Sequence, residues 1–260
     1  MKIIIANWKM NPSAVLEALA LYTAEKKSAL QYPSVTTVIC LPFPYLAIGL
    51  PWKGKSWEIK KRGAQDMFWE EAGAYTGEIS PTILKDYCVE YVILGHSERR
   101  TYLGETNEMI NKKVLAALRN NITPILCVGE TQEEGEQGKK EEVLTKQIQI
   151  SLGGIETISA TDIPKKIIIA YEPHWAVGTG VSDTPENTVK TIQFLKELTK
   201  KYAPITFTFI YGGSLDDKNA RDFLKEKEIE GALIGKASLD PVQFSEILRI
   251  ASGIEHTTPQ

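Results

Sequence analysis

The sequence has little cysteine and little histidine, with only three of each among its 260 residues. Cys40, Cys88 and Cys127 lie in apolar segments, and their spacing matches neither a disulfide framework nor a metal site. An odd number of cysteines without a pairing pattern is typical of a reducing compartment. We therefore expect no bound metal and a cytoplasmic protein.

The sequence also lacks an excess of charge and a long apolar run. Its formal net charge is -3 and its isoelectric point is about 5.8, which gives no reason to expect nucleic acid or an anionic membrane as a partner. The apolar run at residues 3–6 is followed at once by Asn7 and Lys9, so it is too short for a signal peptide or a membrane span. A composition of 43% hydrophobic and 24% charged residues is ordinary for a soluble globular protein.

What the sequence does contain is a regular alternation of apolar runs and helical patterns. The expected strands lie at residues 2–8, 36–41, 57–65, 90–94, 122–128, 167–171, 205–211 and 231–234. The expected helices lie at residues 12–30, 81–87, 105–120, 131–152, 184–200, 217–225 and 242–250. The strands are apolar throughout, which is typical of a parallel sheet covered on both faces. An eightfold repeat in a chain of this length favours a single (β/α)8 barrel with a closed eight-stranded parallel sheet over an open doubly wound sheet. We expect one domain over 1–253 and a polar tail over 254–260.

The sixth expected strand ends in a carboxylate that is followed by a loop with apolar residues and glycines. Glu172 follows the run Ile167–Ile169, and Pro173 prevents the strand from continuing. The loop then carries Trp175, Val177 and the sequence Gly178-Thr179-Gly180 before a helix begins at Thr184. A general base under a closing lid would need this arrangement. The alternative is a solvated glutamate before an ordinary loop, because strand-end carboxylates are common in such units.

Other chemically capable side chains also follow strands. Asn7 and Lys9 follow the first strand, and His96 and Glu98 follow the fourth. In a barrel, the carboxyl ends of all strands lie on one face, where active sites are found. Each residue alone would more often be an incidental surface residue, but together with Glu172 they would share one face.

Glycine-rich turns follow the last two strands. One is Tyr211-Gly212-Gly213-Ser214 and the other is Ile234-Gly235-Lys236. Turns of this kind, each leading to a helix, are the usual phosphate site of these barrels. The alternative is a pair of tight turns that need glycine only for their backbone. The sequence 178–180 is not a dinucleotide fingerprint, because the third glycine is missing.

At this point five segments identify a family. They are Asn7-Trp8-Lys9-Met10-Asn11, Gly73-Ala74-Tyr75-Thr76-Gly77-Glu78, Leu94-Gly95-His96-Ser97-Glu98-Arg99-Arg100, Tyr171-Glu172-Pro173 with the residues up to Gly180, and Tyr211-Gly212-Gly213-Ser214. In order and spacing, they closely resemble triosephosphate isomerase. The resemblance runs from the first strand to the last.

The resemblance implies roles for these residues. Glu172 would abstract the proton alpha to the substrate carbonyl, neutral His96 would polarise the carbonyl, and Lys9 would stabilise the enediolate, with Asn7 shaping the oxyanion site. The supporting residues would be Glu98, Cys127 and Glu130. Phosphate would bind backbone N–H groups of Gly178, Ser214, Gly235 and Lys236, under a lid at 173–182.

The resemblance also implies the reaction and the assembly. The protein would interconvert D-glyceraldehyde 3-phosphate and dihydroxyacetone phosphate in glycolysis and gluconeogenesis, without a metal or an organic cofactor. The loop at 66–80 carries more aromatic surface than an exposed loop should. The resemblance favours a homodimer in which Thr76 reaches toward Asn7 and Lys9 of the other subunit, although the loop could instead fold back on its own barrel.

Three departures from the family pattern stand out. His174 replaces a usually apolar residue at the lid hinge, residues 181–183 replace a lysine-containing hinge, and Lys236 replaces a glycine at the phosphate site. Alternative functions are an epimerase or aldolase of the same barrel type and a barrel that binds a phosphorylated effector without catalysis. An epimerase would often need more metal-binding histidines, and a Schiff-base aldolase would need a lysine where Ile167–Ile169 stand.

Overall fold

The computed structural model describes residues 1–48, 50, 61–158, 166–178 and 180–253. Parallel strands pair in chain order, and β8 pairs with β1 to close a barrel. The strands are β1 (Ile3–Asn7), β2 (Thr36–Leu41), β3 (Arg62–Ala64), β4 (Val89–Leu94), β5 (Thr123–Val128), β6 (Lys166–Tyr171), β7 (Thr206–Tyr211) and β8 (Gly231–Ile234). The predicted closed eight-stranded parallel barrel is therefore confirmed.

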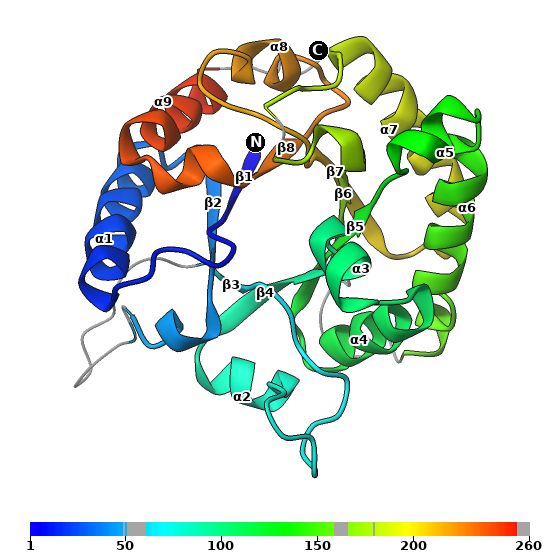
Figure 1. Ribbon diagram of the computed structural model, residues 1–260, viewed down its shortest axis with the longest axis horizontal. Helices are drawn as coiled ribbons and strands as arrows, with labels where there is room; N and C mark the ends of the chain where they lie inside the picture. Colours follow the sequence, from blue (N-terminus) through cyan, green and yellow to red (C-terminus); the bar gives the residue numbers. More distant parts are fainter. Residues whose placement is uncertain (49, 51–60, 159–165, 179, 254–260) are drawn as a thin grey trace.

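Helices form a ring around the barrel (Figure 1). They are α1 (Val15–Gln31), α2 (Pro81–Asp86), α3 (Ser97–Leu103), α4 (Asn107–Arg119), α5 (Gln132–Glu136), α6 (Lys140–Ser151), α7 (Pro185–Thr199), α8 (Ala220–Leu224) and α9 (Pro241–Ser252). Short 3-10 helices add η1 (Phe43–Tyr45), η2 (Ile155–Thr157), η3 (His174–Ala176), η4 (Lys200–Tyr202) and η5 (Lys236–Leu239). All these elements lie within 3–252, and residues 254–260 of the expected tail lie outside the described residues.

The apolar strands contribute side chains to two separate cores, because successive side chains point to opposite faces of a strand. In β1, Ile3 and Ile5 belong to the cluster inside the barrel, whereas Ile4 and Ala6 belong to the cluster between sheet and helices. The barrel closes tightly at Gly231, where an added Cβ would lie 1.8 Å from the carbonyl oxygen of Ile3. Only glycine permits this approach of β8 to β1.

The structure differs from the expected elements in several places. The structure adds α3 at Ser97–Leu103, a short, polar helix capped by His96 that precedes the helix expected at 105–120. The helix expected at 131–152 is two helices, α5 and α6, which Gly138 separates with a φ of 70°. Within the strand expected at 57–65, residues 62–64 form β3, residues 61 and 65 lie beyond its ends, and residues 57–60 lie outside the described part of the chain.

The buried ammonium of Lys2 links the start of β1 to the loop before β8. Its Nζ donates to the carbonyl oxygens of Ile229 at 2.5 Å and Glu226 at 3.0 Å. Burial is the main cause that lowers the pKa of Lys2 from 10.5 to about 8, against the opposing effect of Glu230. The folded chain therefore gives up this proton more readily than the unfolded chain does.

From this shift we expect a pH-dependent contribution of Lys2 to stability. A lysine in the unfolded chain has a pKa of about 10.4. Between pH 8 and that pH, the unfolded chain therefore binds more protons than the folded chain does. The free energy of unfolding should therefore rise with pH in this window, by up to about 3 kcal/mol from this group. Denaturant titrations of wild type and Lys2→Met at pH 7.5 and pH 10 test this, because the variant lacks the effect. Parallel pH profiles for the two proteins would contradict it.

Candidate active site

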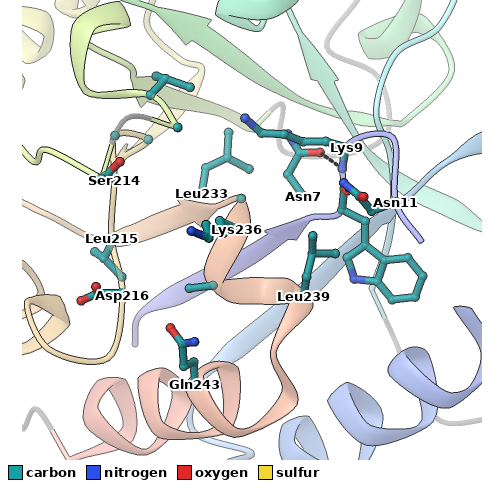
Figure 2. A pocket seen from close by; sticks show the side chains of 18 of the residues that line it. Asn7, Lys9, Asn11, Ser214, Leu215, Asp216, Leu233, Lys236, Leu239 and Gln243 are labelled. Atoms are coloured by element: carbon teal, nitrogen blue, oxygen red, sulfur yellow. Dashed lines mark hydrogen bonds between the residues drawn. The ribbon is translucent and has the colours of Figure 1, made fainter. Parts of the chain in front are cut away.

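One cavity of ≈ 460 Å³ opens at the carboxyl ends of the strands. Figure 2 shows side chains that reach it from the ends of β1 and β8, from the loop after β7 and from the start of α9. Of the site residues predicted from the sequence, those that line it are Asn7, Lys9, His96, Gly178, Ser214, Gly235 and Lys236. The barrel thus brings together residues from both ends of the chain.

Lys9 lies directly after β1 in an unusual backbone conformation. Its φ is 54°, a left-handed value that costs free energy for a residue with a side chain. The backbone N–H of Lys9 donates to Oδ1 of Asn7 at 3.0 Å, and its Nζ donates to Glu98 at 2.5 Å. Asn7 thereby fixes the turn, and Glu98 orients the ammonium without lining the cavity itself.

His96 caps the N-terminus of α3. Its Nδ1 accepts a hydrogen bond from the backbone N–H of Glu98 at 3.2 Å. A ring nitrogen that accepts an N–H carries no proton, so the proton of the neutral ring lies on Nε2. This Nε2 stands 3.6 Å from Oε1 of Glu172. The first turn of α3 therefore sets the tautomer of the imidazole.

Glu172 follows β6 directly and is only 1% exposed. Its Oε2 accepts the backbone N–H of Ser97 at 3.2 Å, whereas Oε1 has no hydrogen-bond partner among the described residues. Leaving a buried carboxylate oxygen unpaired is costly, at roughly 1–3 kcal/mol or more. Gly212 packs against this side chain and leaves room for it. Such a poorly solvated carboxylate is suited to accept a proton from a bound molecule.

Cys127 lies inside the barrel, below the cavity rather than in it. Burial, and next the nearby charge of Glu172, raise the pKa of its thiol well above 9.0. The group therefore stays a neutral thiol beside the carboxylate. Its carbonyl oxygen accepts a hydrogen bond from Arg100 at 3.1 Å, which ties β5 to α3.

The glycine-rich turns also line the cavity, and the side chain of Lys9 passes the backbone of Gly235. Both the N–H and the hydroxyl of Ser214 donate to the carbonyl oxygen of Ala176, at 3.0 and 2.6 Å. These donors become available to a bound anion only when that contact is released. Lys236 begins η5 and has no positive φ, so a side chain is tolerated at this departure from the family pattern.

The remaining predicted residues, Glu172 among them, are not among those that line the cavity. Glu130 is buried, and it accepts a hydrogen bond from the hydroxyl of Tyr171 at 3.0 Å. Thr76 is exposed in the loop at 66–80. His174 is partly buried at the start of η3, and desolvation is the main cause that lowers its pKa.

Several cavity residues carried no signal in the sequence. Three of them are Asp216, Asn219 and Gln243. They stand in loops and helices after β7 and β8 without a motif, so only the folded chain identifies them. Among the described residues no cluster of three or more His, Cys, Asp or Glu side chains is suited to hold a metal ion, and none of the described helices is long and apolar enough to cross a membrane.

A closed (β/α)8 barrel with a buried carboxylate and an imidazole facing each other at the carboxyl ends of its strands belongs to the class of barrel enzymes that move protons. A family model described as triosephosphate isomerase matches residues 2–251. The triosephosphate isomerase of Dictyoglomus turgidum is 44% identical over 254 residues, which cover 95% of this chain and 98% of that protein. That of Aquifex aeolicus is 43% identical over 252 residues, with coverage of 95% and 98%.

The crystal structure of triosephosphate isomerase from Bartonella henselae is similar over 96% of this chain and 98% of that chain, with a TM-score of 0.81 and 32% sequence identity. The chain belongs to the triosephosphate isomerase family. It is therefore a glycolytic isomerase, as the resemblance predicted.

Proposed function

We propose that this chain interconverts D-glyceraldehyde 3-phosphate and dihydroxyacetone phosphate through an enediolate, in glycolysis and gluconeogenesis. The observation that carries the proposal is the buried carboxylate of Glu172, whose unpaired Oε1 lies 3.6 Å from Nε2 of His96. A proton acceptor and a hydrogen-bond donor at this separation suit a reaction that removes a proton next to a carbonyl.

In the proposed reaction, Glu172 takes the proton from the carbon next to the carbonyl. The Nε2–H of His96 donates to the carbonyl oxygen as negative charge develops there, and the ammonium of Lys9 stabilises that charge, with Asn7 holding the Lys9 turn. Glu172 then returns the proton to the former carbonyl carbon, while the hydroxyl proton on the other carbon moves to the former carbonyl oxygen, so that the carbonyl group now stands on that other carbon. This pairing of acid and base is the known one of the family. Neither a metal nor an organic cofactor is part of the proposal.

The proposed phosphate site is formed by backbone groups that line the cavity, with Gly235 next to the side chain of Lys9. Backbone N–H groups of Gly178, Ser214, Gly235 and Lys236 would bind the anion, as such turns commonly do. Ser214 must first release the carbonyl oxygen of Ala176, so phosphate binding would require a movement of the loop after β6. Closure of a lid at 173–182 would follow and exclude water from the enediolate.

A direct assay tests the proposed reaction. Purified protein is given D-glyceraldehyde 3-phosphate, and dihydroxyacetone phosphate is measured with and without a chelator. We expect turnover that the chelator leaves unchanged. Absence of turnover, together with absence of binding by an enediolate-like phosphate compound, would refute the assignment.

The close packing of Gly212 against the side chain of Glu172 leads to a prediction for Gly212. A Cβ at this position would lie 2.5 Å from Cγ of Glu172, so alanine must displace the carboxylate. Because small misplacements of a reacting group are costly, Gly212→Ala should lower kcat by at least about tenfold. Gly135→Ala in α5 is the matched control, since its Cβ would meet only Glu130, at 3.7 Å. Equal kcat for both variants would contradict the prediction.

We also propose that the protein acts as a cytoplasmic homodimer. Exposed apolar side chains support this, with Met10 94% and Tyr102 79% exposed, together with Tyr75 in the loop at 66–80. Thr76 would contact the partner near Lys9, which makes the assembly relevant to the active site.

This assembly predicts that Thr76→Arg lowers activity through dissociation. A large cation would be buried without a partner in the interface, which is strongly unfavourable. Sedimentation velocity should give a mass of twice the chain for wild type and a smaller average mass for the variant, with a parallel loss of activity at low protein concentration. A wild-type protein that sediments as a fully active monomer would contradict the prediction.

A further inference from the structure

The segment that crosses the cavity between β6 and α7 is held at both ends by backbone hydrogen bonds. At its start, the N–H of His174 donates to the carbonyl oxygen of Glu130 at 2.9 Å. At its end, the N–H of Asp183 donates to the hydroxyl of Tyr211 at 3.0 Å. These contacts mark residues near 173 and 183 as the fixed points of the segment.

The carboxylate of Asp183 anchors the second fixed point to α7. It is buried, and it accepts hydrogen bonds from Thr184 N at 2.8 Å, Asn187 Nδ2 at 2.7 Å and Thr188 Oγ1 at 3.1 Å. A negative charge at a helix N-terminus is also favourable. The residue therefore does more than cap a helix, because its own backbone N–H holds Tyr211 at the end of β7.

A lysine from α6 extends this anchor toward the first fixed point. Nζ of Lys140 lies 3.3 Å from Oδ1 of Asn187 and 3.4 Å from the hydroxyl of Tyr171. That hydroxyl donates to Oε1 of Glu130 at 3.0 Å, and Glu130 is the residue whose carbonyl holds His174. A continuous polar chain thus joins both ends of the segment through Asn187, Lys140 and Tyr171.

We propose that Asp183 and Lys140 are positioning residues that tie the two ends of this segment together, so that it moves over the substrate as one unit. The proposal rests on the proposed function, because it assigns a role in the same reaction. Alternating charges from Asp183 through Lys140 to Glu130 hold the chain together, and all of it is at least partly buried. Neither residue is among those that line the cavity.

If Asp183 and Lys140 no longer link the two ends of the segment, the enediolate is exposed to a side reaction. In this side reaction an electron pair of the enediolate oxygen forms a carbonyl at C1, and the double bond moves from C1–C2 to C2–C3. The C3–O bond then breaks, and phosphate leaves with the electron pair of that bond. A segment that closes properly disfavours this elimination and excludes water. Release of inorganic phosphate per isomerisation event therefore reports on the segment rather than on the base.

The experiment compares Asp183→Ala and Lys140→Met with three other proteins. Asp183→Asn keeps an acceptor oxygen, Thr184→Ala removes the neighbouring cap of α7, and Lys139→Met removes an exposed neighbouring ammonium. We expect the first two variants to lose about tenfold in kcat/KM, since hydrogen bonds to charged groups are lost. They should also release at least about fivefold more phosphate per turnover. Asp183→Asn should recover part of both effects.

Two results would overturn the proposal. The first is a normal phosphate release in Asp183→Ala and Lys140→Met, whatever their stability. The second is an equal rise in Thr184→Ala, which would mean that any damage to the start of α7 suffices. Failure of the proposed function itself would instead appear as an inactive wild-type protein, so the two failures are distinguishable.

Discussion

Replacing Glu172 by glutamine should lower kcat by between about 100-fold and 10,000-fold, the range that a positioned general base contributes. The amide has nearly the shape of the carboxylate, and it can still accept the N–H of Ser97. It cannot take a proton from carbon. Because phosphate binding would use backbone N–H groups rather than this carboxylate, KM for the triose phosphate should change much less than kcat.

The same substitution separates catalysis from stability. In the wild-type protein Glu172 buries a charge with one unpaired oxygen, which disfavours the folded state. The thermal unfolding temperature of Glu172→Gln should therefore be equal to or higher than that of wild type, a trade-off common at active sites. Glu186→Gln, at an exposed position in α7, is the control and should change neither property. Full activity in Glu172→Gln would remove this carboxylate from the mechanism.

The barrel was predictable because its signals are local and repeated. Apolar runs such as Thr36–Leu41 are buried on both faces and gave the strand bounds directly. Failures occurred where tertiary context decides. The short polar α3 is stabilised by contacts of its arginines, of which Arg100 donates to Gly95, Asn107 and Cys127. The break at Gly138 had a local signal in its glycine, but the strongly charged helical pattern on both sides concealed it.

The site was predictable in its residue types and less so in its geometry. Strand ends identified Lys9, His96 and Glu172 as candidates, because the fold brings all carboxyl ends to one face. The sequence could not reveal that Ser214 donates to Ala176, or that Lys140 from α6 reaches Tyr171 at the end of β6. Those contacts join segments far apart in the chain, and no residue pattern encodes them.

The second large effect is expected at Lys9. Lys9→Met keeps most of the aliphatic stem, which passes the backbone of Gly235, but removes the ammonium that faces the cavity. In the wild-type protein this charge would stabilise both the dianionic substrate and the enediolate. Its loss should therefore lower kcat/KM by about 100- to 1,000-fold. Unlike Glu172→Gln, this variant should lose substrate affinity as well as kcat.

The ion pair of Lys9 with Glu98 provides an internal check on this interpretation. If Lys9 acted only by neutralising Glu98, then removing both charges in the double variant Lys9→Met/Glu98→Gln would restore activity. We expect no restoration, because the ammonium acts on the substrate, and Glu98 only orients it at 2.5 Å. Added small alkylammonium ions should instead recover part of the activity of Lys9→Met, and Lys190→Met on the exposed face of α7 should behave as wild type. Restoration by the double variant would reassign Lys9 to a structural role and leave the enediolate charge to His96 alone.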